Sequence, residues 1–169
     1  MKYFTAAVFA LSIFENSPGH AEYPDFAQNP VSDIDMFDGT PAPVDILSYP
    51  KAVNYRKQLT DGAAKGPNFA GHYTVVTIEC GTLCQENWIV DAQTGKIVNK
   101  IHSELYTRYQ PDSNLLIVNP ADPDIKISYE KHPQAANWDK IKTSYVLWDN
   151  NKFYTIHQDN WTNVIKILR

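Results

Sequence analysis

The residues best suited to chemistry lie in one segment, HYTVVTIECGTLCQENWIVDAQTG (72–95), which holds both cysteines of the chain, Cys80 and Cys84. His72, Glu79 and Glu86 belong to the same segment, so thiols, an imidazole and carboxylates occur close together in the sequence. A cysteine pair at this spacing suits a metal site, a redox couple, a catalytic thiol, a structural disulfide or a displayed binding loop. Each of these uses places its own demands on the neighbouring residues.

A metal site, a redox couple and a catalytic thiol each need partner residues that this sequence does not supply in the usual pattern. A redox pair is typically C-x-x-C at a helix start, which lowers the thiolate pKa, whereas this C-x-x-x-C pair lies between predicted strands beside Glu79 and Glu86. Zinc needs three or four ligands, and neither a second cysteine pair nor H-x-x-x-H is present. A catalytic cysteine needs a histidine partner. The histidines outside the N-terminal segment match no signature: His72, His102, His132 and His157. We therefore predict no catalytic residue, no metal ligand and no cofactor.

The N-terminus predicts export. Residues 1–21 combine Lys2, an apolar run over 3–14 and small residues at Gly19 and Ala21, the pattern of a secretory signal peptide. The apolar run is shorter than the roughly 20 residues of a membrane-spanning helix, and no later stretch is long or apolar enough. We expect cleavage near Ala21 and a periplasmic or secreted protein with no membrane span. In such an oxidising compartment Cys80 and Cys84 are expected to form a disulfide.

Composition and charge narrow the class further. The chain is 43% hydrophobic and 12% aromatic, which is enough for a packed core, and its net charge of −4 argues against a nucleic-acid partner. Residues 22–50 carry acidic side chains and no Lys or Arg, and contain several prolines. We interpret 22–50 as an extended, solvated arm on which Phe26, Val31, Ile34, Phe37, Val44 and Ile46 contact the domain.

The elements that must position the cysteines are mostly strands. Residues 52–65 form a predicted helix, with Ser48 near its N-cap and Gly66-Pro67 at its end. The predicted strands cover residues 72–80, 87–91, 96–101, 105–109, 114–119, 143–148 and 152–157. Residues 159–169 are interpreted as a helical tail, with a strand as the alternative. Residues 120–139 receive no element. The prediction is an α+β domain over 51–169, mostly an antiparallel meander of hairpins with one N-terminal helix packed on it.

A family resemblance is carried by GPNFAGHYTVVTIECGTLCQENWIVDAQTGKIV (66–98). This run resembles a family of small, uncharacterised exported bacterial proteins that share a PNFAGHY…CGTxC…VDxxTGK motif. The resemblance extends to PAPVD (41–45), YQPDSNLLIV (109–118) and YVLWDNNKFY (145–154). It implies the architecture and export of that family but no activity.

The functional prediction is a non-enzymatic domain that displays a disulfide-tightened hairpin loop to a protein or cell-envelope partner. The predicted contact residues are Leu83, Gln85, Trp88, His72 and Glu79. An inhibitor of an envelope-attacking enzyme is one variant, because the arrangement is similar to that of periplasmic inhibitors of c-type lysozyme. The alternatives are a small envelope hydrolase that uses His72, Glu79 and Glu86, and a structural accessory protein.

Overall fold

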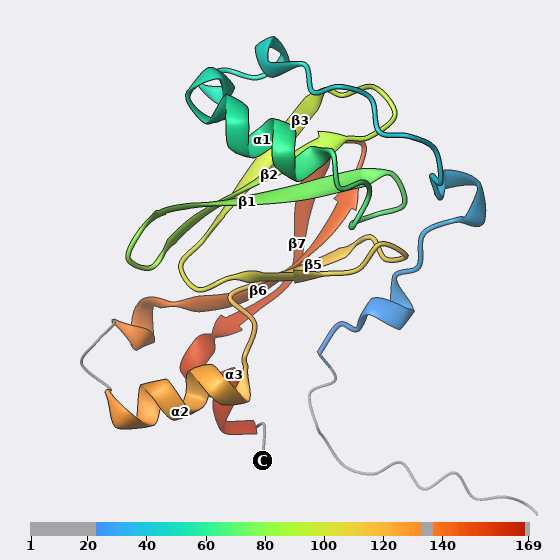
Figure 1. The fold of residues 1–169 in the computed structure, drawn as a ribbon. Coiled ribbons are helices and arrows are strands. Elements are labelled where there is room, and N and C mark those ends of the chain that lie inside the picture. The colour runs from blue at the N-terminus through green and yellow to red at the C-terminus, as the bar shows by residue number, and fades with distance from the viewer. Residues whose placement is uncertain (1–22, 133–136, 168–169) are drawn as a thin grey trace, which may run out of the picture.

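The computed structural model describes residues 23–132 and 137–167, which form two antiparallel sheets and three α-helices (Figure 1). The predicted signal peptide (1–21) lies outside the described residues. Strands are hydrogen-bonded in consecutive order within each sheet, and one helix precedes them and packs on the first. The predicted α+β class with antiparallel hairpins is therefore confirmed.

The first sheet contains β1 (Tyr73–Gly81), β2 (Cys84–Asp91) and β3 (Ile97–Ser103). Its outer face is apolar at one end, where α1 (Arg56–Ala63) and two short 3-10 helices, η3 (Ile46–Ser48) and η4 (Ala52–Tyr55), cover it. The core beneath them consists of Ile46, Ala52, Leu59, Ala63, Val76, Ile78, Trp88, Val90 and Ile97. The helix approaches the sheet closely at Gly62, where a Cβ atom would lie 2.5 Å from Val76 Cγ1.

The predicted helix over 52–65 is shorter than expected because its first turn is η4, a 3-10 helix that follows Lys51 in a left-handed conformation (φ 70°). Ser48 does not cap this helix. It ends η3, and its hydroxyl accepts a hydrogen bond from the Ile97 amide at 2.8 Å. Ser48 thereby ties the helical layer to β3.

The second sheet contains β4 (Thr107–Tyr109), β5 (Leu115–Val118), β6 (Lys142–Asp149) and β7 (Lys152–Asn160). One face packs on the inner face of the first sheet through a shared core: Phe69, Ala70, Val75, Ile89, Leu116, Val118, Val146 and Trp148. The other face is covered by Tyr23 and Phe26 of the N-terminal arm. The layers are thus helix, sheet, sheet and arm.

Helices α2 (Pro123–Lys131) and α3 (Trp161–Ile167) share a smaller core with the 3-10 helix η5 (Trp138–Lys140). The helical tail is confirmed, whereas α2 falls in a segment to which the sequence assigned no element. Its apolar residues Ile125, Ile127 and Tyr129 alternate, and Ile127 is exposed, so helical periodicity is absent. In the described part of the chain, no helix has the length and apolarity needed to cross a bilayer.

The acidic arm lies against the sheets and contains short 3-10 turns, η1 (Phe26–Gln28) and η2 (Asp33–Asp35), rather than being extended throughout. It is anchored by bridges between Pro30 and Ser113 and between Asp45 and Lys96. Ile46 is buried in the core as expected, but Ile34 is 89% exposed, so its predicted contact with the domain is wrong. Ile34 projects to solvent because η2 turns it outward.

Candidate functional site

The hairpin of β1 and β2 is closed at its tip by a disulfide between Cys80 and Cys84, which confirms the predicted bond. Gly81 pairs with Cys84, so Thr82 and Leu83 form the turn. Gly81 has φ 142° and Leu83 has φ 52°, values that glycine adopts easily and leucine rarely. The bridged Cα atoms are 5.1 Å apart. The short ring therefore holds the exposed Leu83 in one conformation.

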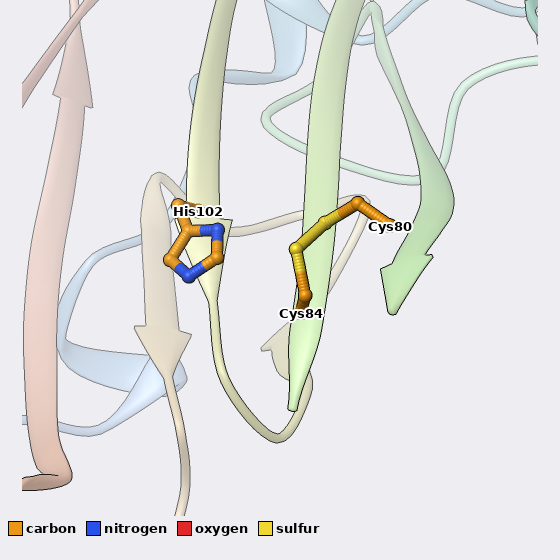
Figure 2. A group of neighbouring side chains, drawn as sticks. All are labelled: Cys80, Cys84 and His102. Atoms are coloured by element: carbon orange, nitrogen blue, oxygen red, sulfur yellow. A yellow bond between two sulfur atoms is a disulfide. The ribbon is translucent and has the colours of Figure 1, made fainter. Parts of the chain in front are cut away.

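The imidazole of His102 faces this disulfide from the neighbouring strand β3 (Figure 2). Glu86 pairs with His102 across the sheet, and Cys84 precedes Glu86 by two residues, so Cys84 and His102 share a face. The two sulfur atoms and a ring nitrogen lie within 4.8 Å of one another. His102 and Cys80 are exposed and Cys84 is half-buried. We call this group of three side chains the open end of the sheet.

Sequence reasoning missed His102 as a partner of the cysteines, because it lies far beyond Cys84 in the chain and in no motif. The only signal is strand register. A turn at residues 92–95 folds β3 back onto β2, so the pairing of Glu86 with His102 is the step that brings the imidazole to the disulfide. Composition and spacing alone do not contain that register.

A charged pair separates the open end from the apolar core. The Lys100 ammonium forms an ion pair with the Glu86 carboxylate and lies 4.9 Å from the centroid of the Trp88 ring. A cation over an indole face is attracted by the negative potential of the ring. Lys100 therefore lies over the ring of Trp88, and this face of the sheet changes from apolar to polar at this point.

The hairpin tip also borders a hollow of about 290 Å³, which we call the hairpin notch. Its lining residues are Glu79, Gly81, Leu83, Cys84, Gln85, Glu104, Leu105 and Ile125. The side-chain oxygen of Gln85 is buried and has no hydrogen-bond partner in the described part of the chain. Leaving such a buried acceptor unpaired costs about 1–3 kcal/mol.

Helix α2, which forms one wall of the notch through Ile125, is anchored by a polar cluster. Asp122 caps the helix by accepting from the Asp124 amide at 2.8 Å, and it also accepts from the Tyr106 hydroxyl at 2.8 Å. The Arg108 guanidinium lies 3.3 Å from the same carboxylate. The hydrogen bond from Tyr106 lowers the pKa of Asp122. Burial, together with the bond to Asp122, raises the pKa of Tyr106 to about 12.

A second hollow, of about 330 Å³, lies at the opposite end of β1 and includes His72. It is lined by Val31, Asp35, Ala70, His72, Tyr73, Asn114, Trp148, Asp149, Asn150 and Asn151. His72 Nδ1 lies 3.3 Å from the backbone oxygen of Asp35 rather than from its carboxylate. Among the described residues, no hydrogen bond joins the His72 ring to a carboxylate, so a histidine–carboxylate pair is not formed in this hollow.

Of the predicted contact residues, Leu83, Gln85 and Glu79 meet in the hairpin notch, whereas His72 lines the other hollow. Trp88 is 0% exposed beneath the helical layer, between Tyr49 and Tyr55. A partner cannot reach this ring, which corrects its assignment as a contact residue. Side chains alternate between the two faces of a strand, and the position of Trp88 on β2 places it on the face that α1 covers.

The grouping of His72, Glu79 and Glu86 as hydrolase residues also fails in space. His72 immediately precedes β1, whereas Glu79 lies near the far end of that strand. Glu86 pairs with Ile78, so its side chain lies on the opposite face of the sheet from that of Glu79. The three side chains therefore do not converge on one substrate position.

Comparison with protein-family models, curated proteins and solved structures found no match for this chain. The resemblance to small exported bacterial proteins therefore stays a prediction. Two features remain for a functional inference: the disulfide-closed tip with the hairpin notch, and the imidazole of His102 beside the two sulfur atoms.

Proposed function

We propose that this chain is an exported, non-enzymatic binding domain that recognises a protein partner of the cell envelope through the hairpin tip and the hairpin notch. The observation that carries the proposal is the meeting of Leu83, Gln85 and Glu79 in one accessible hollow beside the disulfide. Inhibition of an envelope-attacking enzyme is one form that such binding takes. Export is supported by the signal-like residues 1–21 and by the disulfide, since disulfides persist in oxidising compartments.

The rigidity of the tip favours binding. A loop that is already held in its bound conformation loses less conformational entropy when a partner docks on it. The Cys80–Cys84 bond closes the turn, and Leu83 is an apolar side chain that is 36% exposed at its end. Leu83 is therefore a pre-positioned apolar contact.

The chemistry of the notch indicates which partner side chain enters it. Leu83, Leu105 and Ile125 supply apolar surface, while Glu79 and Glu104 supply negative charge. Lys and Arg combine an apolar stem with a cationic donor head, which matches this lining. We therefore assign to the notch a basic side chain from a protein partner.

The test is affinity capture from an envelope extract with the wild-type protein and Leu83→Asp as baits, followed by a binding titration with the purified captured protein. Leu83→Asp removes the apolar contact and adds an anion, so we expect affinity to fall at least tenfold. Leu47→Asp is the matched control, because Leu47 is 85% exposed on η3, away from the notch. If wild type and Leu83→Asp recover the same proteins, the hairpin is not the contact.

The sign of the partner charge is tested separately with Glu79→Gln. Neutralising this exposed carboxylate should weaken binding of the captured partner. The affinity should also depend less on salt concentration, because one charge–charge attraction across the interface is lost. A partner that binds Glu79→Gln more tightly than wild type would show that an acidic or apolar group enters the notch instead.

A hydrolase is the second candidate, and one observation favours it: His72 shares its hollow with Asp35 and Asp149. This alternative predicts solubilisation of cell-wall material by the purified protein and its loss in His72→Ala. Leu83→Asp should leave that activity unchanged, since it alters a different hollow. Absence of activity in the wild-type protein, or full activity in His72→Ala, removes this hollow as the site.

A further inference from the structure

The open end of the sheet has the composition of a soft-metal site. Cys80 and Cys84 supply two sulfur atoms, and His102 supplies an imidazole nitrogen from the adjacent strand (Figure 2). Thiolates select Cu(I) and Zn(II), and imidazole suits both ions. We propose that, when the disulfide is reduced, these three side chains bind one thiophilic metal ion, Cu(I) or Zn(II).

The geometry requires only small movements. The three donor atoms lie within 4.8 Å of one another. Metal–sulfur and metal–nitrogen distances of about 2.3 and 2.0 Å place two donors on one ion roughly 3.5–4 Å apart. The imidazole therefore needs to approach by at most about 1.3 Å, which rotation of an exposed side chain supplies. Separation of the sulfur atoms follows from breaking the disulfide bond.

The strands, rather than the disulfide, hold the ligands in place. Outside the ring, Glu79 pairs with Gln85, and Ile78 pairs with Glu86. Glu86 in turn pairs with His102. These backbone contacts do not depend on the sulfur–sulfur bond, so reduction leaves all three ligands on neighbouring positions of one sheet.

The number of ligands bears on the choice of ion. Among the described residues, the cluster contains two cysteines and one histidine and no fourth member. Zn(II) is usually four-coordinate, so it would add a water molecule to the three protein ligands. Cu(I) is satisfied by few soft ligands, and the exposure of Cys80 and His102 leaves the site accessible to either ion.

The reaction balances in two steps. A dithiol reductant gives two electrons and two protons to the Cys80–Cys84 bond, which breaks to two thiols while the reductant becomes a disulfide. The metal ion then displaces the two thiol protons to solvent and forms two metal–sulfur bonds and one bond to the neutral His102 nitrogen. Its oxidation state does not change. The oxidised protein has no thiolate to offer, so metal binding is coupled to the redox state of the hairpin.

The experiment is an anaerobic competition titration of the purified protein against a chromophoric Cu(I) chelator and, separately, a chromophoric Zn(II) chelator. A phosphine reduces the disulfide and is removed before the metal is added, and circular dichroism checks that the reduced protein stays folded. We expect the reduced wild type to take up one equivalent of at least one ion, and the oxidised protein to take up none. The Cys80→Ser and Cys84→Ser variants should lose binding.

The role of His102 is tested with His102→Ala and His102→Gln, against His132→Ala as the matched control. His132 is also exposed but lies after α2, outside the cluster. We expect the His102 variants to bind at least tenfold more weakly, and X-ray absorption to show two sulfur atoms and one nitrogen around the ion only in the wild type. Equal binding by oxidised protein, no uptake of either ion by the reduced protein, or unchanged affinity in both His102 variants would overturn the proposal.

Discussion

The same face of the first sheet has two very different ends. At the covered end, Val76, Trp88, Val90 and Ile97 are buried beneath α1, η3 and η4. At the open end, Cys80 and His102 are exposed and Cys84 is half-buried, on the same strands and the same face. Lys100 and Glu86 mark the boundary. The difference is therefore made by what lies above the strands rather than by the strands themselves.

The lengths of the elements explain where the boundary falls. Helix α1 has eight residues, or about 12 Å, whereas β1 has nine residues, or about 30 Å. The helix is too short to cover the strands along their whole length. Side chains that can do chemistry occupy the part of the face that the helix leaves uncovered, and apolar side chains occupy the rest.

The largest expected effect comes from removing the central ring of the covered end. Trp88→Ala should lower the free energy of unfolding by about 3–5 kcal/mol, because it leaves a large cavity beneath Tyr49 and Tyr55. Urea denaturation followed by circular dichroism measures the change. Leu47→Ala, at an exposed position, should change the free energy by less than about 0.5 kcal/mol. A small loss in Trp88→Ala would mean that the covered end does not carry the stability of the sheet.

Removing the disulfide at the open end should lower the free energy of unfolding by a smaller amount. Replacing both Cys80 and Cys84 by serine should cost about 2 kcal/mol, because the closed loop is short and constrains the unfolded chain only weakly. The denaturation midpoint of the oxidised wild type, compared with that of the double variant, gives the value. Hydrogen exchange should increase near Leu83 while the amides of Trp88 and Val90 stay protected. Equal loss of protection at both ends would show that the two ends unfold together.

A substitution at the contact between helix and sheet tests how closely α1 must pack. Gly62→Ala places a Cβ atom 2.5 Å from Val76 Cγ1. The clash should outweigh the gain in helix propensity and give a net loss of about 1 kcal/mol. In a Val76→Ala background the two Cγ contacts are gone and only the Cβ atom of residue 76, at 3.3 Å, stays close, so the same change should cost much less. The double-mutant cycle from denaturation curves gives the coupling energy, and zero coupling would exclude this contact as the limit on packing.

An effect of similar size, which depends on pH, is expected at α2, the wall of the hairpin notch. The pKa of Asp122 is lowered in the folded protein, so its contribution to stability is present above about pH 4 and is lost as the pH falls through the lower folded value. The pKa of Tyr106 is raised to about 12, so stability falls as the pH rises from about 10 through that value.

Tyr106→Phe removes the hydrogen bond that links these two groups. The loss at neutral pH should be about 0.5–1.5 kcal/mol, and both pH dependences should become shallower. Denaturation midpoints measured from pH 2 to 12 for the two proteins test this, with Tyr154→Phe as a control at an exposed tyrosine. Identical pH profiles in wild type and Tyr106→Phe would mean that Asp122 is held by its other partners alone.

Much of this architecture is readable from local sequence signals. Alternation along residues 73–79 predicts both faces of β1, and the Asn150-Asn151 turn, with φ of 48° and 60°, joins β6 to β7 as its composition indicates. The cysteine spacing and the expected compartment predict the disulfide. Each of these signals lies within a few neighbouring residues.

The features that the sequence did not predict depend on contacts between distant residues. Trp88 is a core residue because α1 lies above it. From the sequence alone, an aromatic residue at this position suits a binding face equally well, so the two roles could not be distinguished. His102 becomes a neighbour of the cysteines only through the register of β2 and β3. In α2, apolar and polar residues alternate, so the sequence does not show helical periodicity. The helix is stabilised instead by its Asp122 cap and by packing of Tyr129 on Trp138 and Trp161.

The anchoring of the acidic arm has a kinetic consequence. The Ser113 hydroxyl donates to the backbone oxygens of Phe26 and Asn29, and the Asp45 amide donates to the Gly95 oxygen. These partners are separated by long stretches of chain, and contacts of that kind form slowly because a large loop must close first. During synthesis, and during any export through a channel, the arm emerges before the strands that hold it. We therefore expect the arm to reach its native position last, so during refolding the Asp45 amide should become protected from hydrogen exchange later than the amides of the sheets.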